Sequence, residues 1–338
     1  MKNLYQLAFQ YQKSELWKSL WDNQLFAIKF SDGQIGYCCV MGAAGEFCGM
    51  GIYIGDEGIN SYLKMASSDF MEMEETEIKF SQQCLMCSFV KPSLMDRNSQ
   101  LKTRTSLKNA GFDLKQIKLY PVFEKFLKYH LPTTNINNFD KQYLIEALYA
   151  CLEVVSKLKE KSLDELHLTD TKNLFNKTIP SLICKKDGNY TWRTRKLPQE
   201  VFTDCGYAQD YNLVLAQKIK NMKSTDNTWL CGIFRFHSPI KDAEGIPYFP
   251  LVQVILDKES EFMYNMEICK FEERQETVFP NKLFEIIKEF GKPKKIIFTD
   301  IRVVLIYDKL LKELGIDLVY EPNLKSINRV KLQLRNYK

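Results

Sequence analysis

The sequence predicts a mixed α/β fold of two related units, with a mostly helical region between them. Three observations support this. The chain has 338 residues, and 45% of them are hydrophobic, which is enough to build more than one core. β-rich runs bounded by turn residues alternate with segments whose apolar side chains recur at helical spacing. Both ends of the chain follow one order, in which a three-stranded antiparallel meander precedes a helix, a strand and a second helix.

The N-terminal unit begins with a helical pattern and continues into closely spaced β-rich runs. Asp32-Gly33, between the first two runs, is typical of a tight hairpin turn. The final helix of this unit is marked by Pro92 in its first turn and by Gly111 after its last turn. The expected elements, in chain order, are a helix over 4–22, strands over 25–30, 35–41 and 47–54, a short helix from Asp56, a strand over 83–90 and a helix from Pro92 to Gly111.

The C-terminal unit repeats this order and adds a strand and a basic tail. The helix after the fourth strand ends LKNAGF in the first unit and LKELGI in the second, which favours a duplication; two common arrangements of separate origin would give the same pattern. The expected elements are strands over 228–237, 248–256 and 261–269, a helix from Pro280 to Gly291, a strand over 294–299, a helix over 303–315, a strand over 316–322 and a tail helix over 326–338.

The region between the units is expected to be mostly helical. Apolar side chains at three- and four-residue spacing predict the helices, a hairpin is expected about Asp187-Gly188, and the polar run 223–228 is the expected linker. The helices are expected over 120–130, 140–160 and 207–223. The resulting division is an N-terminal domain over 1–165, a connecting hairpin and helix over 166–225, and a C-terminal domain over 226–338.

Composition favours a cytoplasmic protein with reduced thiols. Most of the ten cysteines lie in apolar runs, where a free cysteine behaves as a small buried hydrophobe. The sequence has no signal-peptide pattern and no apolar run long enough to cross a bilayer, so no membrane partner is expected. The net charge of +5 is small for this length, and it permits an anionic partner without indicating one.

Cys84 and Cys87 form a CxxC pair inside an expected strand. Residues three apart in a strand point to opposite faces, so these two thiols cannot share a zinc ion. The chain has no second CxxC and only three histidines. We therefore expect buried packing for both cysteines, with no metal site and no cofactor.

The strand order of the C-terminal unit and the run GKPKKIIFTDIR…LLKELGIDLVYEP resemble the ribonuclease-H-like fold, which includes integrase cores. This resemblance implies a site in which clustered carboxylates hold two metal ions beside a phosphodiester. The catalytic candidates are Asp257 after the second strand, Asp300 after the fourth and Glu321 after the fifth. The first strand contains no carboxylate, so the resemblance implies a degenerate core. Mg²⁺ is expected only if the chain is an enzyme.

Asp300 itself has two interpretations. It stands directly before an expected helix, where its carboxylate can accept hydrogen bonds from first-turn N–H groups as an N-cap. It also lies beyond the carboxyl end of a strand, where ligands of open α/β sheets gather. The sequence favours the cap and leaves ligand binding open.

A second candidate site is a basic and aromatic run on an expected strand. Its residues alternate, so that Arg193 and Arg195 lie on one face and Tyr190 and Trp192 on the other. Such a surface can hold phosphates and stack bases, and it is also typical of an edge strand protected by charge. The candidate nucleic-acid-binding residues are Lys185, Lys186, Trp192, Arg193 and Arg195.

The runs LWKSLWDNQLFAIKFSDGQIGYCCVMG, GIYIGDEGINSYL, QCLMCSF and YPVFEKFLKYHLP resemble an uncharacterised bacterial family made of two domains of unknown function. This resemblance implies no activity and no catalytic residues. The expected function is therefore a non-catalytic binding or regulatory module with an unknown protein or ligand partner. The alternative is a metal-dependent, nuclease-like enzyme that acts on nucleic acid, and a third possibility is a regulatory or defence-associated scaffold.

Overall fold

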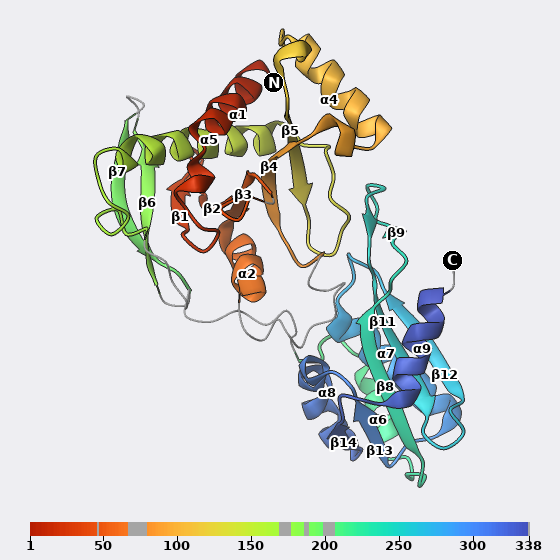
Figure 1. Ribbon diagram of the computed structural model, residues 1–338. Coiled ribbons are helices and arrows are strands. Elements are labelled where there is room, and N and C mark those ends of the chain that lie inside the picture. Colours follow the sequence, from red (N-terminus) through yellow and green to blue (C-terminus); the bar gives the residue numbers. More distant parts are fainter. Residues whose placement is uncertain (46, 67–79, 169–176, 186–188, 199–206, 337–338) are drawn as a thin grey trace. The chain divides into compact units, whose positions relative to one another are not determined.

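The computed structural model describes residues 1–45, 47–66, 80–168, 177–185, 189–198 and 207–336 of the chain (Figure 1). The chain divides into two compact units, Met1–Val201 and Phe202–Lys338. Each unit has its own main sheet with helices on both faces. Within the described residues, no helix is both long enough and apolar enough to cross a membrane.

The first unit is built on a seven-stranded sheet in the order β5-β4-β3-β2-β1-β6-β7. Strands β1 to β5 form an antiparallel meander in which each strand pairs with the one before it. β6 then pairs in parallel with β1, and β7 pairs antiparallel with β6 and forms one edge of the sheet, with β5 at the other. The strands are β1 (Phe26–Lys29), β2 (Ile35–Met41), β3 (Gly49–Ile54), β4 (Cys84–Val90), β5 (Tyr120–Phe126), β6 (Thr178–Cys184) and β7 (Tyr190–Lys196).

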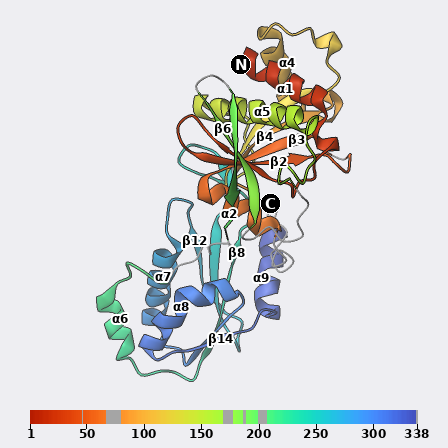
Figure 2. The same cartoon turned by 90° about the vertical axis from the view of Figure 1, so that its left-hand side faces the viewer.

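Helices cover both faces of this sheet (Figure 2). α1 (Lys2–Ser14), α4 (Arg97–Asn109) and α5 (Asn138–Leu158) contribute to the larger core on one face. α2 (Gly55–Ala66) packs into a smaller core on the other face. Successive residues of β1 alternate between the two cores, as the two-residue period of a strand requires.

The start of α5 is fixed by a capping box joined to a buried ion pair. The Asn137 side chain accepts from the backbone N–H of Asp140 (2.9 Å), and the Asp140 carboxylate accepts from the N–H of Asn137 (3.0 Å). The same carboxylate, which is buried, accepts from Lys125 Nζ on β5 at 3.1 and 3.2 Å. Asp140 therefore joins the beginning of α5 to an edge strand of the sheet.

The second unit is built on a five-stranded sheet in the order β12-β11-β8-β13-β14. β8, β11 and β12 form an antiparallel meander, β13 runs parallel to β8, and β14 runs parallel to β13. A two-stranded hairpin of β9 (Ile240–Lys241) and β10 (Pro247–Tyr248) lies between β8 and β11 in the chain. The sheet strands are β8 (Thr228–Arg235), β11 (Leu251–Asp257), β12 (Met263–Cys269), β13 (Lys295–Phe298) and β14 (Asp317–Tyr320).

Four helices cover this sheet (Figure 2). α6 (Leu213–Lys220), α7 (Gln275–Phe290) and α8 (Ile301–Leu314) pack on one face, and α9 (Lys325–Asn336) packs on the other. α9 approaches the sheet closely at Gly232, where a Cβ atom would meet the side chain of Ile327 at 2.6 Å. The absence of a side chain at Gly232 is thus what lets α9 reach the middle of β8.

The structure confirms the mixed α/β class and the shared order of elements at the two ends of the chain. The pairing of the fourth main strand differs between the units. In the second unit, the fourth main strand, β13, pairs in parallel with the first, β8. In the first unit, the fourth strand, β4, pairs antiparallel with the third, β3, and it is β6 that pairs in parallel with β1. The middle of the chain contains helices α5 and α6 together with strands β5, β6 and β7.

The helix predicted over 120–130 is wrong, because residues Tyr120–Phe126 form strand β5. Apolar side chains at 120, 123 and 126 fit helical spacing, but pairing with β4 along seven residues decides the conformation. The first helix is also shorter than predicted. It ends at Ser14, where Glu15 adopts a left-handed conformation (φ 49°), and a single 3₁₀ turn follows.

The predicted start of α7 at Pro280 is wrong. The helix begins at Gln275, and Pro280 lies inside it, five residues after the first helical residue. Proline has no N–H, so the carbonyl of Glu276 loses its helical donor. That carbonyl accepts instead from the backbone N–H of Gln209 (3.0 Å). A contact from outside the helix thus replaces the bond that Pro280 cannot make. The expected Asp187-Gly188 turn lies outside the described residues.

Candidate nucleic-acid interface

The three candidate carboxylates of the second unit lie at opposite ends of the strands of its sheet. Asp300 follows the carboxyl end of β13. Glu321 follows β14 at the same edge, and its backbone N–H donates to the carbonyl of Phe298 (2.8 Å). Asp257 is paired with Trp229 near the first residue of β8, because β11 runs antiparallel to β8. The structure therefore brings Asp300 and Glu321 together at the carboxyl end of β13 and β14, and it places Asp257 at the opposite end of the strands.

Asp257 organises the turn between β11 and β12. One carboxylate oxygen accepts from the backbone N–H of Glu259 (3.1 Å) and from the N–H and hydroxyl of Ser260 (both 2.8 Å). The other accepts from the hydroxyl of Tyr264 (3.2 Å). The hydrogen bond from the Ser260 backbone N–H is the largest influence that lowers the pKa of Asp257. These contacts give Asp257 a structural role at the turn.

Replacing Asp257 with asparagine is expected to reduce the free energy of unfolding by about 1 kcal/mol at neutral pH, because a carboxylate accepts these bonds more strongly than an amide. The folded-state pKa of Asp257 is lowered, so its charge stabilises the fold above the unfolded-state pKa of about 4 and stops doing so as pH falls through the folded-state value. The difference between the variant and the wild type should therefore shrink below about pH 4. Urea titrations at several pH values measure it, and a difference that stays constant down to pH 2 would contradict this role.

β8, the strand that the resemblance assigns a central carboxylate, has none along its length. Its middle is filled by packing instead. Cys231 points into the core beneath α7 and α8, and Gly232 lies under Ile327 of α9. Among the described residues, no group of three or more His, Cys, Asp or Glu side chains is close enough to hold a metal ion.

Asp300 stands at the beginning of α8. Its backbone carbonyl accepts from the N–H groups of Val303 (3.1 Å) and Val304 (3.3 Å), which places it at the N-cap position. Capping by its carboxylate remains a prediction.

Cys84 and Cys87 lie on opposite faces of β4, in agreement with the two-residue period. Cys87 belongs to the larger core of the first unit, and Cys84 belongs to the smaller core under α2. Burial raises the pKa of Cys84 to about 12 and that of Cys87 still further, so both are thiols at neutral pH. Both side chains are core residues.

The basic and aromatic run forms the edge strand β7. Its side chains alternate as expected. Trp192 packs on the α5 face and donates from Nε1 to the carboxylate of Glu153 (3.1 Å), and Arg195 donates to the hydroxyl of Tyr37 (3.1 Å) from the other face. Arg193 is exposed. Lys185 is exposed at the end of β6, and Lys186 lies outside the described residues.

A cavity of about 380 Å³ lies beside Trp192 and Arg193. Lys157 and Lys161 also line it, near the C-terminal end of α5, and Lys157 is paired with Glu160 (3.0 Å). The cavity wall includes Glu165. Charges of both signs therefore surround it.

A much stronger concentration of positive charge lies on the segment 91–118, which we call the basic segment. It contains seven Lys and Arg residues against two Asp, a net charge of +5 that equals the net charge of the whole chain. All seven cations are exposed, and none makes an ion pair with a carboxylate in the described part of the chain. They are Lys91, Arg97, Lys102, Arg104, Lys108, Lys115 and Lys118.

α4 forms the middle of the basic segment and is held to the first unit by few apolar contacts. Leu107 is its one buried residue. Just after the helix, Phe112 packs edge-on against Tyr5 and at a tilt against Phe9 of α1, with ring centroids 6.1 and 5.1 Å apart. At the other end, the Asp96 carboxylate caps the helix by accepting from the N–H groups of Asn98 and Ser99 (both 3.0 Å). Apart from the exposed Leu101, the side chains that α4 presents to solvent are polar or basic.

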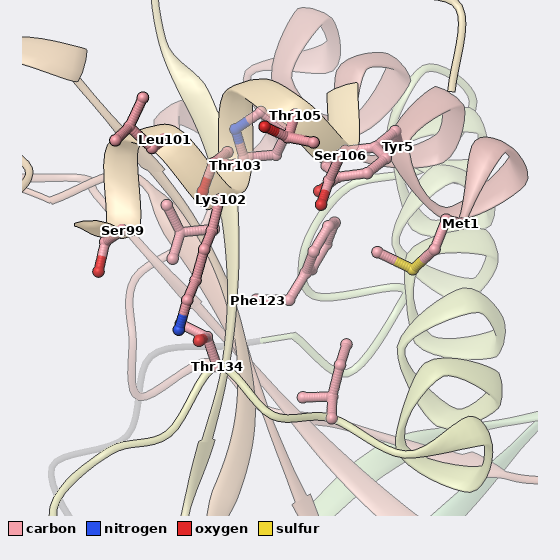
Figure 3. Close-up of a pocket in the computed structure, with 13 residues that line it drawn as sticks. Met1, Tyr5, Ser99, Leu101, Lys102, Thr103, Thr105, Ser106, Phe123 and Thr134 are labelled. Atoms are coloured by element: carbon pink, nitrogen blue, oxygen red, sulfur yellow. The ribbon is translucent and has the colours of Figure 1, made fainter. Parts of the chain in front are cut away.

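A cavity of about 510 Å³ lies between α4, α1 and β5 (Figure 3). Figure 3 shows Phe123 between the α4 side chains on one side and Met1 on the other. Burial raises the pKa of Tyr5, and a hydrogen bond with Ser106 opposes that rise. Lys102 supplies the cation of the cavity wall. The hydroxyl-bearing residues in the wall are Tyr5, Ser99, Thr103, Thr105, Ser106 and Thr134.

Sequence reasoning missed the basic segment because it considered the net charge of the whole chain, which is modest. A count of charge in windows of about one helix and its flanks would have found it. From Arg97 to Phe112 the chain has four cations and no carboxylate, whereas elsewhere acids and bases nearly cancel.

The chain has weak likenesses among solved structures. The HTLV-2 integrase catalytic core domain in complex with magnesium (trimeric form) matches at 14% identity and a TM-score of 0.25, over 34% of this chain and 71% of that chain. The simian T-cell lymphotropic virus intasome in complex with PP2A regulatory subunit B56 gamma matches at 18% identity and a TM-score of 0.24, over 36% of this chain and 44% of that chain. The expected resemblance to integrase cores is thus found. No curated protein matches the chain.

Family models match both units. A model described as a domain of unknown function (DUF6930) matches residues 215–335. A second, also described as a domain of unknown function (DUF7309), matches residues 2–177, which is more than half of the chain. These are the two domains of unknown function that the sequence led us to expect. The chain therefore belongs to the family of the domain of unknown function DUF7309.

Proposed function

We propose that this chain is a non-catalytic binding protein whose first unit binds the phosphate backbone of nucleic acid through the basic segment. One observation carries the proposal: seven exposed cations, none with a carboxylate partner among the described residues, are gathered in 28 residues, and the net charge of this segment equals that of the whole chain. Lys and Arg that neutralise phosphates release condensed counterions, and this release drives sequence-independent binding.

The charge arrangement within α4 favours an anionic ligand. Arg104 and Lys108 are four residues apart on one side of the helix, where like charges destabilise it by a few tenths of a kcal/mol. α4 contains no acidic residue that would offset this repulsion. A bound polyanion would remove this repulsion, so the helix gains stability when the ligand is present.

The uncharged side chains of α4 suit the same ligand. Ser, Thr, Asn and Gln side chains contact phosphate and sugar oxygens in nucleic-acid complexes. α4 has the sequence RNSQLKTRTSLKN, in which only two residues are apolar, and the exposed hydroxyl of Thr105 directly follows the cation of Arg104 in the sequence. A membrane surface would call for more exposed apolar side chains on the basic face.

The β7 surface is the second candidate surface for the same ligand. Lys185 and Arg193 are exposed there, whereas Trp192 and Arg195 already hydrogen-bond within the chain. These intramolecular bonds support protection of an edge strand by charge. We therefore assign the main contact with nucleic acid to the basic segment. The contribution of β7 is tested with its own variant.

The competing function is a metal-dependent, nuclease-like enzyme with a degenerate core. The observation that favours it is the position of Asp300 and Glu321 at the same end of neighbouring strands. The absence of a carboxylate from β8 supports the non-catalytic function proposed above, because a two-metal site needs a bridging carboxylate between its ions.

We propose a reducing, cytoplasmic location. The nine cysteines in the described residues are free thiols, and seven of them are buried.

Fluorescence anisotropy with labelled single-stranded and duplex oligonucleotides tests the proposed function. We expect both to bind regardless of sequence, with Kd values on the order of 1–100 μM near physiological salt. The oligonucleotides should remain full length after incubation with Mg²⁺ or Mn²⁺. Absence of binding at low salt would contradict the binding function, and cleavage that Asp300→Asn abolishes would favour the nuclease instead.

A further inference from the structure

The edge strand β12 of the second unit differs from the other sheet edges. In the first sheet, the edge strand β7 carries Arg193, Arg195 and Lys196, and the other edge strand, β5, contains Pro121 and Lys125. β14, the other edge strand of the second sheet, has only four residues. β12 has seven residues (MYNMEIC) with no Lys, Arg or Pro. Charged residues, prolines and short length are the devices that keep edge strands from pairing with other chains, and β12 has none of the three apart from Glu267.

Apolar side chains flank β12 on the α9 face. Met263 and Met266 are paired with Leu256 and Val254 of β11, whose side chains are buried under α9. The two methionines lie beyond that cover, and each is 38% exposed. They leave a strip of apolar surface at the edge of the sheet.

An aromatic cluster flanks the strand on the α7 side. Phe262 and Phe290 both pack against Tyr264, with ring centroids 5.6 and 4.7 Å from it, and against each other at 6.4 Å; both phenylalanines are exposed. Trp229 lies beneath Tyr264, at a centroid distance of 4.9 Å. Both faces of the edge thus carry apolar surface that remains open in this chain.

The carboxylates next to β12 are neutralised within the same chain. Glu267 pairs with Lys282 of α7 (3.4 Å). Glu261, before the strand, pairs with Arg329 of α9 and accepts from the hydroxyl of Ser326 (2.6 Å). Two copies of this edge therefore meet without opposing unpaired charges, whereas two copies of the β7 edge would bring arginines together.

We propose that β12 pairs antiparallel with β12 of a second copy of this chain, joining two five-stranded sheets about a twofold axis. A twofold axis makes each strand the partner of an identical strand, so a neutral, apolar edge complements itself. Interfaces between identical chains are also more apolar than other interfaces, in agreement with the methionines and aromatic rings around β12. The pairing closes on itself and gives a dimer and nothing larger.

Sedimentation over a range of concentrations tests this proposal on the full chain. The wild type is expected to form a dimer, and Met263→Lys with Met266→Lys is expected to abolish it while leaving the circular dichroism unchanged, because both side chains are already more than a third exposed. Val319→Lys on the β14 edge is the matched control, since Val319 is exposed to a similar degree, and it should leave the dimer intact. A chain that remains monomeric at every concentration, an oligomer larger than a dimer, or a dimer that survives both lysines would overturn the proposal.

A second readout locates the axis. Single cysteines placed at 263, 265 and 266, in a chain whose exposed Cys184 is replaced by serine, should form an intermolecular disulfide efficiently at the position nearest the axis. Equal cross-linking at all positions, or cross-linking only at a control cysteine on β14, would contradict antiparallel β12 pairing. Nucleic-acid binding is measured separately, so failure of either proposal is recognised without the other.

Discussion

Replacing Asp140 with alanine is expected to reduce the free energy of unfolding of the first unit by about 3 kcal/mol. The loss combines a helix cap, worth about 1 kcal/mol, with a buried carboxylate that receives two hydrogen bonds from an ammonium group, worth about 2 kcal/mol more. The variant removes the partner of Lys125, whose side chain is 28% exposed, and it releases the first turn of the 21-residue helix α5. Hydrogen exchange of amides in β2 and β3 reports this loss, because these central strands open only with the whole unit.

Asp96→Ala is the matched control for Asp140→Ala. Asp96 caps α4 by accepting from two backbone N–H groups, and this exposed residue has no ion pair within the described part of the chain. Its replacement should cost clearly less than that of Asp140. Asp140→Asn should lie between the two, since the amide retains the shape of the carboxylate and an acceptor for the cap. Equal losses for Asp96→Ala and Asp140→Ala would show that the buried ion pair contributes nothing.

Reversing three charges of α4, with Lys102→Glu, Arg104→Glu and Lys108→Glu together, is expected to weaken nucleic-acid binding by more than about 100-fold near 0.1 M salt. Each phosphate contact with single-stranded nucleic acid contributes about a fivefold change per tenfold change in salt, and the reversal replaces three attractions with three repulsions. The three side chains are exposed and unpaired in the described structure, so the fold should not depend on them. Fluorescence anisotropy measures the affinity, and circular dichroism checks the fold.

The control for this variant carries the same change of net charge in the second unit. Lys218→Glu, Lys220→Glu and Lys223→Glu alter three exposed cations in and after α6. If attraction by the overall charge of the chain governs binding, both triple variants lose affinity equally. If the basic segment is the contact surface, the α6 variant keeps most of it. Lys185→Glu with Arg193→Glu measures the share of the β7 edge in the same assay.

The sequence predicted local elements well where pattern and turn residues agreed. The run 228–237 is strand β8 over Thr228–Arg235, and the run 261–269 contains β12 over Met263–Cys269. It failed at Tyr120–Phe126, whose apolar spacing suits a helix as well as a strand, because only pairing with a strand thirty residues earlier distinguishes the two.

The candidate sites show why positions along the chain are not enough. Asp257, Asp300 and Glu321 each follow a β-rich run. However, β11 runs antiparallel to β8, whereas β13 and β14 run parallel to it, so the carboxyl end of β11 lies at the opposite end of the sheet. Strand direction, which separates Asp257 from the other two, comes from the long-range order of the sheet. The basic segment is the reverse case. It was readable in the sequence, but its significance depends on the absence of partner carboxylates from the described structure around it.

The salt dependence of binding by the wild type and by the α4 triple variant is the most direct test of the central claim. The logarithm of the binding constant for a single-stranded oligonucleotide is expected to fall linearly with the logarithm of salt concentration, and the slope should be smaller by about 2 in the variant, since three phosphate contacts contribute about 0.7 each. Slopes that are the same for the two proteins would contradict the claim that the basic segment holds the phosphate backbone.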